Sequence, residues 1–376
     1  MKICLFYHSV ISDWNHGNAH FLRGIISSLA ARGHEVVAFE PKGGWSLKNL
    51  ISEKGKSAFD DFIKSFPAHK PVFYSEKDFN PADHIEDADL VIVHEWNDPG
   101  VVKKIGEYRS THRNMILMFH DTHHRTVSAP HEMEKFDLTN YDGVLAFGDV
   151  IRRIYVRNGW SKRVWAWHEA ADDRIFHPVI QEEKEGDLVW IGNWGDDERS
   201  DELQEFIIEP VMELGLKACF YGVRYPADAL KLLKAAKIKY KGWLPNYKVP
   251  EVFGKYRVTV HVPRRPYVEK LPGIPTIRPF EAMACGIPLV CSSWNDSEKL
   301  FTPGKDYLIA HNGDEMKKQL SAVLSDKSLA ASLSAHGLET IRNRHTCDHR
   351  VDQLLCIVNE IRIWNREKVF GTAIHV

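Results

Sequence analysis

The chain has 376 residues, with 49 Lys and Arg against 51 Asp and Glu, and therefore a formal net charge of -2. Its length predicts about two domains, and a hydrophobic content of 44% is enough for sizeable cores. The nearly balanced charge gives no bulk electrostatic reason to expect a nucleic acid or an anionic membrane as partner. The charge therefore identifies no binding partner, and it does not show the oligomeric state.

The first residues, MKICLFYHSV, are too short and too soon interrupted by polar residues for a signal peptide. No segment approaches the roughly 20 apolar residues that cross a bilayer, so we expect a cytoplasmic protein without a transmembrane segment. The six cysteines are scattered without a C-x-x-C pair, which favours buried thiols over disulfides or zinc.

The first half of the chain alternates apolar strands with helical or loop segments. Residues 2–7 predict a strand, HFLRGIISSLAARGHEV a helix that ends near Gly33, and residues 35–40 a second strand, which together form a βαβ unit. Further apolar runs at 89–96, 114–121 and 142–149 predict a parallel sheet covered on both faces. The acidic DAD at 87–89 directly precedes one of these buried strands, so we interpret it as structural and not as a manganese-binding D-x-D.

The same alternation starts again at residue 187. Strands are predicted at 187–194, 217–222, 257–262 and 288–293, with helices near 200–214 and 226–236. The charged segment before them lacks a long periodic pattern, as expected of a linker. The predicted organisation is an N-terminal domain over 1–168, a linker over 169–186, a C-terminal domain over 187–348, and a helix over 349–376 that returns to the first domain.

Glu281 lies in RPFEAMACGIPLV, where a small-residue turn leads into an apolar strand. One interpretation is a first-turn helix residue, with Pro279 at the helix start and Gly286 at its exit. The other is a nucleotide pocket, in which helix-start N–H groups hold phosphate and the carboxylate accepts from ribose hydroxyls. Two facing Rossmann-like domains would place such a pocket in the cleft between them.

Several segments resemble a known family: FEAMACGIPLV, GKDYLIA (304–310), HTCDHR (345–350), HGNAHFLRGIISSLAARGHEV and the linker's EAADDRIFHP. They are similar to GT-B nucleotide-sugar glycosyltransferases, in particular to the spore-maturation-protein-like branch (glycosyl transferases group 1-like). The resemblance implies an α/β fold of two Rossmann-like doubly wound domains that face each other across a cleft. It also implies transfer of a sugar from a nucleotide diphosphate sugar, expected to be UDP-linked, to an unidentified acceptor without a metal or other cofactor.

The resemblance also implies which residues bind the donor. A leaving diphosphate needs cations and backbone N–H donors to stabilise its charge. Glu281 is expected on the ribose and Arg199 on the diphosphate, with Arg264, Arg265 and Lys270 as weaker cationic candidates. The remaining expected donor contacts are Gly17, Asn18, Gly242, Trp243, Thr276, Ile277 and Arg278. Retaining families carry a glutamate eight positions before the equivalent of Glu281, where this chain has Gly273, so the sequence leaves the stereochemical outcome open.

FHDTHHR (119–125) ends a predicted strand, so His120 and Asp121 are expected to point into the cleft as catalytic residues, with Glu95 as a candidate base. One alternative is a metal site formed by His120, His123 and His124, but no second cluster supplies further ligands. Another is a set of ordinary polar loop residues. For the whole chain, a nucleotide-sugar epimerase and a noncatalytic nucleotide- or sugar-binding protein are the rival functions.

Overall fold

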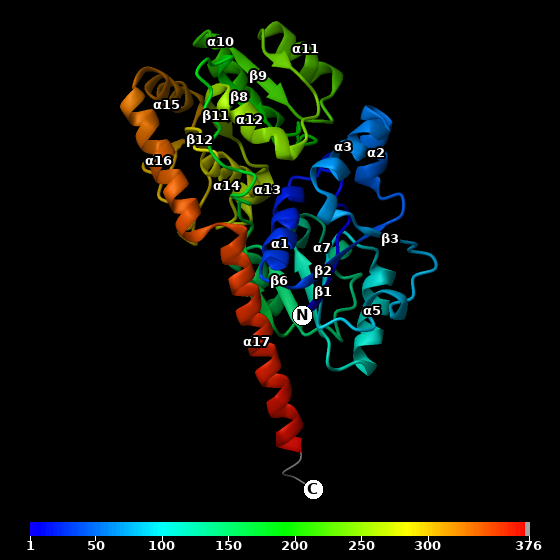
Figure 1. Cartoon of the computed structure of the whole chain (residues 1–376). Coiled ribbons are helices and arrows are strands. Elements are labelled where there is room, and N and C mark those ends of the chain that lie inside the picture. The colour runs from blue at the N-terminus through cyan, green and yellow to red at the C-terminus, as the bar shows by residue number, and fades with distance from the viewer. Residues whose placement is uncertain (373–376) are drawn as a thin grey trace.

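Two parallel β-sheets organise the computed structural model of the protein, which describes residues 1–372 (Figure 1). The first sheet has seven strands in the order β3-β2-β1-β4-β5-β6-β7, and the second has six in the order β10-β9-β8-β11-β12-β13. In each sheet the chain starts at an inner strand, moves to one edge and then crosses to the other side, which makes both sheets doubly wound. The predicted fold class is confirmed.

The strands of the first sheet are β1 (Lys2–Phe6), β2 (Glu35–Pro41), β3 (Val72–Tyr74), β4 (Leu90–His94), β5 (Ile116–Asp121), β6 (Gly143–Ala146) and β7 (Val164–Ala166). Those of the second are β8 (Gly186–Ile191), β9 (Ala218–Tyr221), β10 (Lys239–Tyr240), β11 (Tyr256–His261), β12 (Leu289–Ser292) and β13 (Leu308–Ala310). The sequence did not predict β3, β7, β10 and β13, because edge strands of two or three residues are too short to show a hydrophobic period.

The helices of the first domain are α1 (Ala19–Ala31), α2 (Trp45–Lys54), α3 (Lys56–Ser65), η1 (Pro67–His69), α4 (Ala82–Ile85), α5 (Pro99–Thr111), α6 (Arg125–Ser128), α7 (Pro130–Met133) and α8 (Asp149–Arg157). Those that follow are α9 (Ser200–Leu203), the π-helical turn η2 (Gln204–Ile208), α10 (Glu209–Glu213), α11 (Ala227–Ala235), η3 (Asn246–Lys248), α12 (Val249–Gly254), α13 (Arg265–Glu269), α14 (Ile277–Ala284), α15 (Gly313–Ser325), α16 (Lys327–Arg344) and α17 (Cys347–Thr372).

The two domains share one continuous apolar core. Its members include Phe21 on α1, Trp167 and Phe176 in the connection between the sheets, Phe280 on α14 and Val351 on α17, all of them at most 1% exposed. Burial of such large side chains is the main favourable contribution to folding. The relative placement of the domains is therefore fixed by the same packing that stabilises each of them.

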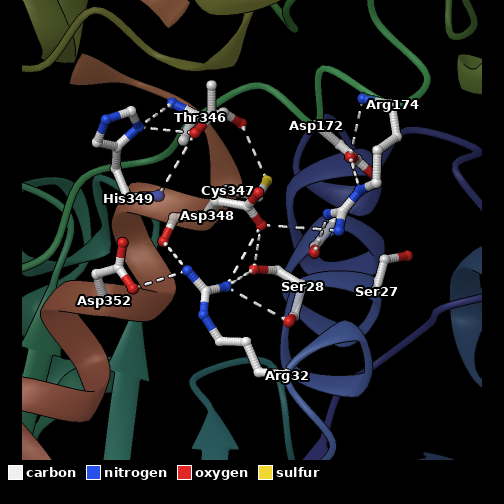
Figure 2. Close-up of polar contacts among 12 residues, drawn as sticks. Ser27, Ser28, Arg32, Asp172, Arg174, Thr346, Cys347, Asp348, His349 and Asp352 are labelled. Carbon is white, nitrogen blue, oxygen red and sulfur yellow. Dashed lines mark hydrogen bonds and ion pairs between the residues drawn. The ribbon is translucent and has the colours of Figure 1, made fainter. Parts of the chain in front are cut away.

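Helix α17 runs from the base of the second domain along the first, continuing from α16 (Figure 1). Figure 2 shows how its start is attached: Arg32, directly after α1, donates to the carboxylate of Asp352 at 2.7 Å and to the carbonyl oxygen of Asp348 at 3.1 Å. The Ser28 hydroxyl donates to the Asp348 carboxylate, and Arg174 from the connection lies 3.7 Å from that carboxylate. The predicted return of the C-terminal helix to the first domain is confirmed.

The segments HTCDHR and EAADDRIFHP meet at this junction, where Ala171 and Thr346 form a parallel bridge. Helix α17 begins at Cys347, two residues before the predicted start, and residues 373–376 of that prediction lie outside the described residues. The predicted domain boundaries stay a prediction. Within residues 1–372, none of the helices has both the length and the apolar composition needed to cross a membrane.

Gly24→Ala tests the packing of α1 against this junction. A Cβ at Gly24 would overlap the Sγ atom of Cys347 and come within 2.8 Å of the Cβ atom of Asp172. At a solvent-exposed helix position, Gly→Ala would stabilise the folded protein by about 1 kcal/mol, whereas overpacking of a buried position costs about 1–3 kcal/mol. We expect a lower free energy of unfolding in urea, with partial rescue in the Gly24→Ala/Cys347→Ala double variant. A gain in stability for the single variant would contradict the packing.

Candidate functional site

A cleft of about 880 Å³ lies between the two domains, within the roughly 300–1,000 Å³ typical of ligand pockets. The N-terminal wall is formed by the residues that follow β1 to β5, and the C-terminal wall by those that follow β8 to β11 together with the start of α14. Parallel strands end at one edge of a sheet, so both walls are built from carboxyl ends of strands, where open α/β sheets bind ligands.

Most of the predicted donor residues line this cleft. They are Gly17, Asn18, Arg199, Trp243, Thr276, Ile277 and Arg278. The weaker cationic candidate Arg264 lines it too, whereas Glu281 and Gly242 do not. The structure thus brings together residues that are far apart in the sequence, while the roles assigned to them stay predictions.

Arg199 gives the C-terminal wall a positive charge that is not paired with a carboxylate in the described chain. Its guanidinium lies over the ring of Trp190, 5.1 Å from the ring centroid, and donates to the carbonyl oxygens of Asn193 and Val262. Among residues 1–372, no carboxylate oxygen lies within 4.0 Å of its nitrogens. Removal from solvent, together with two neighbouring arginines, lowers the pKa of Arg199 to about 9, so it remains cationic at neutral pH.

Arg264 and Arg278 are those neighbours, and both also line the cleft. Each has a carboxylate partner: Arg264 pairs with Glu198 at 2.9 Å, and Arg278 pairs with Glu281. Three guanidinium groups facing one cavity, of which one has no carboxylate partner among the described residues, favour an anionic ligand on this wall.

The start of α14 adds backbone donors to the same wall. Thr276, the residue before the helix, has φ 61° and ψ 180°, a region that costs a residue with a Cβ atom about 1–3 kcal/mol. Its hydroxyl lies 3.3 Å from Nε2 of His261, which also lines the cleft. The N–H groups of Ile277 and Arg278 have no partner within the helix. Pro279 occupies the third helical position and not the first, and Gly286, at φ 64°, ends the helix as predicted.

Glu281 lies beneath the cleft, with no exposed surface. It contacts Nδ1 of His20 on α1 at 2.7 Å and accepts from the Asn246 side-chain amide at 2.8 Å, and its other oxygen pairs with Arg278. Although burial alone would raise it, Arg278 and His20 hold the pKa of Glu281 below its usual value. The carboxylate therefore joins the two domains and orients two cleft residues, Asn246 and Arg278. A contact with ribose stays a prediction.

The structure gives a steric reason for the glycine at 273. Gly273 has φ 90°, and a Cβ there would come within 2.6 Å of Oε1 of Glu298. Glu298 is fixed in this place by His168 at 2.8 Å and by the backbone N–H of Asp149 at 2.9 Å, both from the other side of the domain junction. A glutamate at position 273 would require Glu298 to move.

His120 and Asp121 lie under the lining of the cleft and not in it. The His120 ring packs 4.9 Å from Trp167, both of its nitrogens lack hydrogen-bond partners, and burial lowers its pKa to about 3. Asp121 accepts from the Tyr155 hydroxyl at 2.8 Å and from the His123 N–H at 3.1 Å. Burial and the neighbouring Glu95 raise the pKa of Asp121 to about 8. Catalytic roles for both residues stay predictions.

Glu95 is also fully buried, and its carboxylate pairs with Arg125 and accepts from Thr122. Burial raises its pKa above the usual range even though Arg125 opposes that shift. The neighbouring side chains that do reach the cleft are Trp96, His123 and His124. Within the part of the chain that the structure describes, no three His, Cys, Asp or Glu side chains are grouped to hold a metal ion, and His120, His123 and His124 are no exception.

The sequence did not single out Glu40 and Arg23, which hold the loop between β1 and α1. Glu40 accepts from the backbone N–H groups of Val10 and Ile11, and Arg23 donates to the carbonyl oxygens of the same two residues at 2.7 and 2.8 Å. This loop carries His16, Gly17 and Asn18 to the cleft. The available signal was a glutamate directly after the apolar run VVAF of the predicted second strand.

Asp13, on the same loop, was also missed. It pairs with Arg23 at 3.1 Å and accepts from the indole N–H of Trp243 at 2.8 Å and from the backbone N–H of Asn246 at 2.9 Å. Trp243, one of the expected donor contacts, is thereby held between the two domains while it lines the cleft.

The comparisons with known proteins agree with this geometry. Residues 199–356 match a family model described as glycosyl transferase-like, whereas no curated protein matches the sequence. The structure is similar to sucrose-phosphate synthase from Thermosynechococcus elongatus (TM-score 0.62, 14% identity, 96% of this chain and 99% of that chain). It is also similar to a glycosyltransferase from Rickettsia africae ESF-5 (TM-score 0.66, 12% identity, 96% and 98%) and to an alpha-glucosyltransferase in complex with UDP (TM-score 0.67, 11% identity, 96% and 100%).

The chain has the GT-B fold of glycosyltransferases. The matched segment of this GT-B protein contains Arg199, Arg264, Arg278 and Glu281, and so covers most of the C-terminal wall. Membership of the spore-maturation-protein-like branch stays a prediction.

Glu40→Gln tests the buried attachment of the loop after β1. Burial raises the pKa of Glu40 from 4.5 to about 7, so the stability associated with its protonated form is complete below pH 4.5 and is lost as the pH rises through about 7. Relative to Glu40→Gln, the free energy of unfolding of the parent should fall by about 3 kcal/mol between about pH 4 and pH 8. Urea unfolding across this range measures the difference, and a difference independent of pH would contradict the assignment.

Proposed function

We propose that the protein transfers a sugar from a nucleoside diphosphate sugar to an acceptor bound in the cleft, with UDP as the expected nucleotide. The observation that carries this proposal is the charge of Arg199, which has no paired carboxylate among the described residues and lies beside Arg264, Arg278 and the start of α14 on the C-terminal wall. Structures similar in fold include the HepE protein of Anabaena in complex with UDP and glucose, and the alpha-glucosyltransferase in complex with UDP.

The proposed reaction develops negative charge on the leaving group, which the C-terminal wall can stabilise. The bond between the anomeric carbon and the phosphate oxygen breaks, and the nucleoside diphosphate leaves with the electron pair. The acceptor oxygen bonds to the anomeric carbon and loses its proton, so one nucleoside diphosphate and one proton are released. Negative charge grows on the leaving phosphate, and fixed cations and N–H groups stabilise such charge without reorganisation. Arg199 and the N–H groups of Ile277 and Arg278 are the groups that we assign to this task.

A noncatalytic nucleotide-binding protein is the second candidate, and Gly273 is the observation that favours it. The position that carries a glutamate in retaining families has no side chain here, and Glu298 fills the adjacent space. Release of nucleoside diphosphate from the donor only when acceptor is added would distinguish transfer from binding alone. The cytoplasmic location stays a prediction.

Arg199→Met tests the diphosphate site. Charged hydrogen bonds contribute about 1.5–3 kcal/mol each, so we expect the affinity for UDP to fall by about tenfold or more in calorimetry. Arg257→Met is the matched control, because Arg257 is exposed and pairs with Asp187 away from the cleft. Both variants must keep the melting temperature of the parent, since Arg199 also binds backbone carbonyls. Unchanged UDP affinity in a folded Arg199→Met protein would place the diphosphate elsewhere.

Chelation tests the proposed metal independence. Because arginines and backbone N–H groups are assigned to the diphosphate charge, the dissociation constant for UDP should be the same in EDTA as in buffer with Mg²⁺ or Mn²⁺. Calorimetry in the three buffers provides the comparison, with the Arg199→Met variant alongside. Binding that is lost in EDTA and restored by a divalent ion would show that the cations of this wall are not sufficient.

A further inference from the structure

The N-terminal wall differs in chemistry from the arginine-rich wall that faces it. It exposes two large aromatic side chains, Trp45 and Trp96, which are 54% and 43% accessible to solvent. Single exposed apolar residues are common on protein surfaces. Neither tryptophan is a member of a buried apolar cluster of the described residues, yet both line one ligand-sized cleft.

Both tryptophans are held in fixed positions. The Arg125 guanidinium lies 4.1 Å from the ring centroid of Trp96, and Arg125 is itself fixed by the buried carboxylate of Glu95. Trp45, the first residue of α2, packs edge-on against Trp14 with 5.0 Å between ring centroids. An aromatic ring that is fixed before binding provides contact area at a low entropic cost. Buried Glu95 therefore holds Arg125 in place against the exposed ring of Trp96.

Histidines provide the polar groups of the same wall. His8, His16, His123 and His124 line the cleft, and each has a ring nitrogen that lies just below the surface without a hydrogen-bond partner in the described chain. Burial lowers the pKa of His8 to about 3 and that of His124 to about 4, and it lowers those of His16 and His123 well below the usual value. A neutral imidazole offers one donor and one acceptor, and a hydroxyl group can pair with either of them.

The charges on this wall argue against a polyanionic acceptor. No arginine among residues 1–372 lines it, and its exposed charged residues are Lys42 and Glu76, one of each sign. Asp13 is paired with Arg23. Binding of DNA or RNA depends on several cations that neutralise phosphates. The cations of the cleft lie on the opposite wall, where the donor diphosphate is assigned.

We propose that the N-terminal wall binds the acceptor as an uncharged saccharide, whose rings stack on Trp96 and Trp45 and whose hydroxyls bond to the neighbouring histidines. This inference rests on the transferase function proposed above. Apolar C–H faces of a sugar ring match the face of an indole, while its hydroxyls match neutral donor and acceptor groups. The wall presents both features within one cleft.

The test uses the full chain saturated with UDP on an array of neutral oligosaccharides, acidic oligosaccharides and single-stranded DNA, followed by calorimetry with the best neutral glycan. Trp96→Ala and Trp45→Ala should each weaken that glycan by about tenfold while UDP affinity stays that of the parent. Trp364→Ala, an exposed tryptophan on α17 outside the cleft, is the control and should change neither affinity. Trp96→Phe, which keeps an aromatic face, should bind the glycan more tightly than Trp96→Ala.

The outcomes separate the two proposals. If UDP binds but no neutral glycan does, or if only acidic glycans or DNA bind, the saccharide inference is overturned and the donor site stands. The same holds if both tryptophan variants fold and bind the glycan as the parent does. If UDP fails to bind while a neutral glycan binds in a tryptophan-dependent way, the saccharide site stands and the donor assignment fails.

Discussion

The parallel direction of every strand is the constraint on which the rest of the molecule depends. Parallel strands need crossover helices, and their carboxyl ends, with the loops that follow, all lie at one edge of a sheet. The apolar core that includes α1, α14 and α17 then holds the two sheets with these edges facing one another. The cleft is therefore a consequence of strand direction and shared packing, and the loops that line it are free to carry polar groups.

Buried charge is distributed around this cleft in a consistent way. Asp13 has Arg23 and two N–H donors, Glu281 has Arg278, His20 and Asn246, and Glu95 has Arg125. An ionised group removed from water is costly unless it is paired, so these partners are what permits the burial. Arg199 departs from this pattern, because its described partners are carbonyl oxygens and an indole ring. A cation left without an anion beside an open cavity is the physical basis for assigning an anionic ligand.

The two walls also divide the chemistry between two substrates. The C-terminal wall combines arginines with a helix start, where Thr276 is held in a strained conformation. The N-terminal wall combines neutral histidines with fixed tryptophans and has little net charge. A site that must bind a diphosphate on one side and hydroxyl groups on the other needs this asymmetry, since a cation that favours the leaving group gives no advantage in binding an uncharged acceptor.

The sequence by itself predicted the longer inner strands, because hydrophobic periodicity is a local property. The alternation of strands and helices, together with the resemblance of the quoted segments, also predicted the class of fold and the return of the last helix. It also placed Arg199, Thr276, Ile277 and Arg278 near one another, because each of them follows a predicted strand or starts a helix at the same sheet edge. Only the tertiary structure decided what covers each strand end. His120 is buried because Trp167, from the connection between the domains, packs against it, and Glu281 is enclosed because His20 reaches it from the other domain. These two contacts join residues that are 47 and 261 positions apart. Many polar side chains lie at strand ends, and a local sequence pattern does not show which of them will contact a distant residue and which will face the cleft.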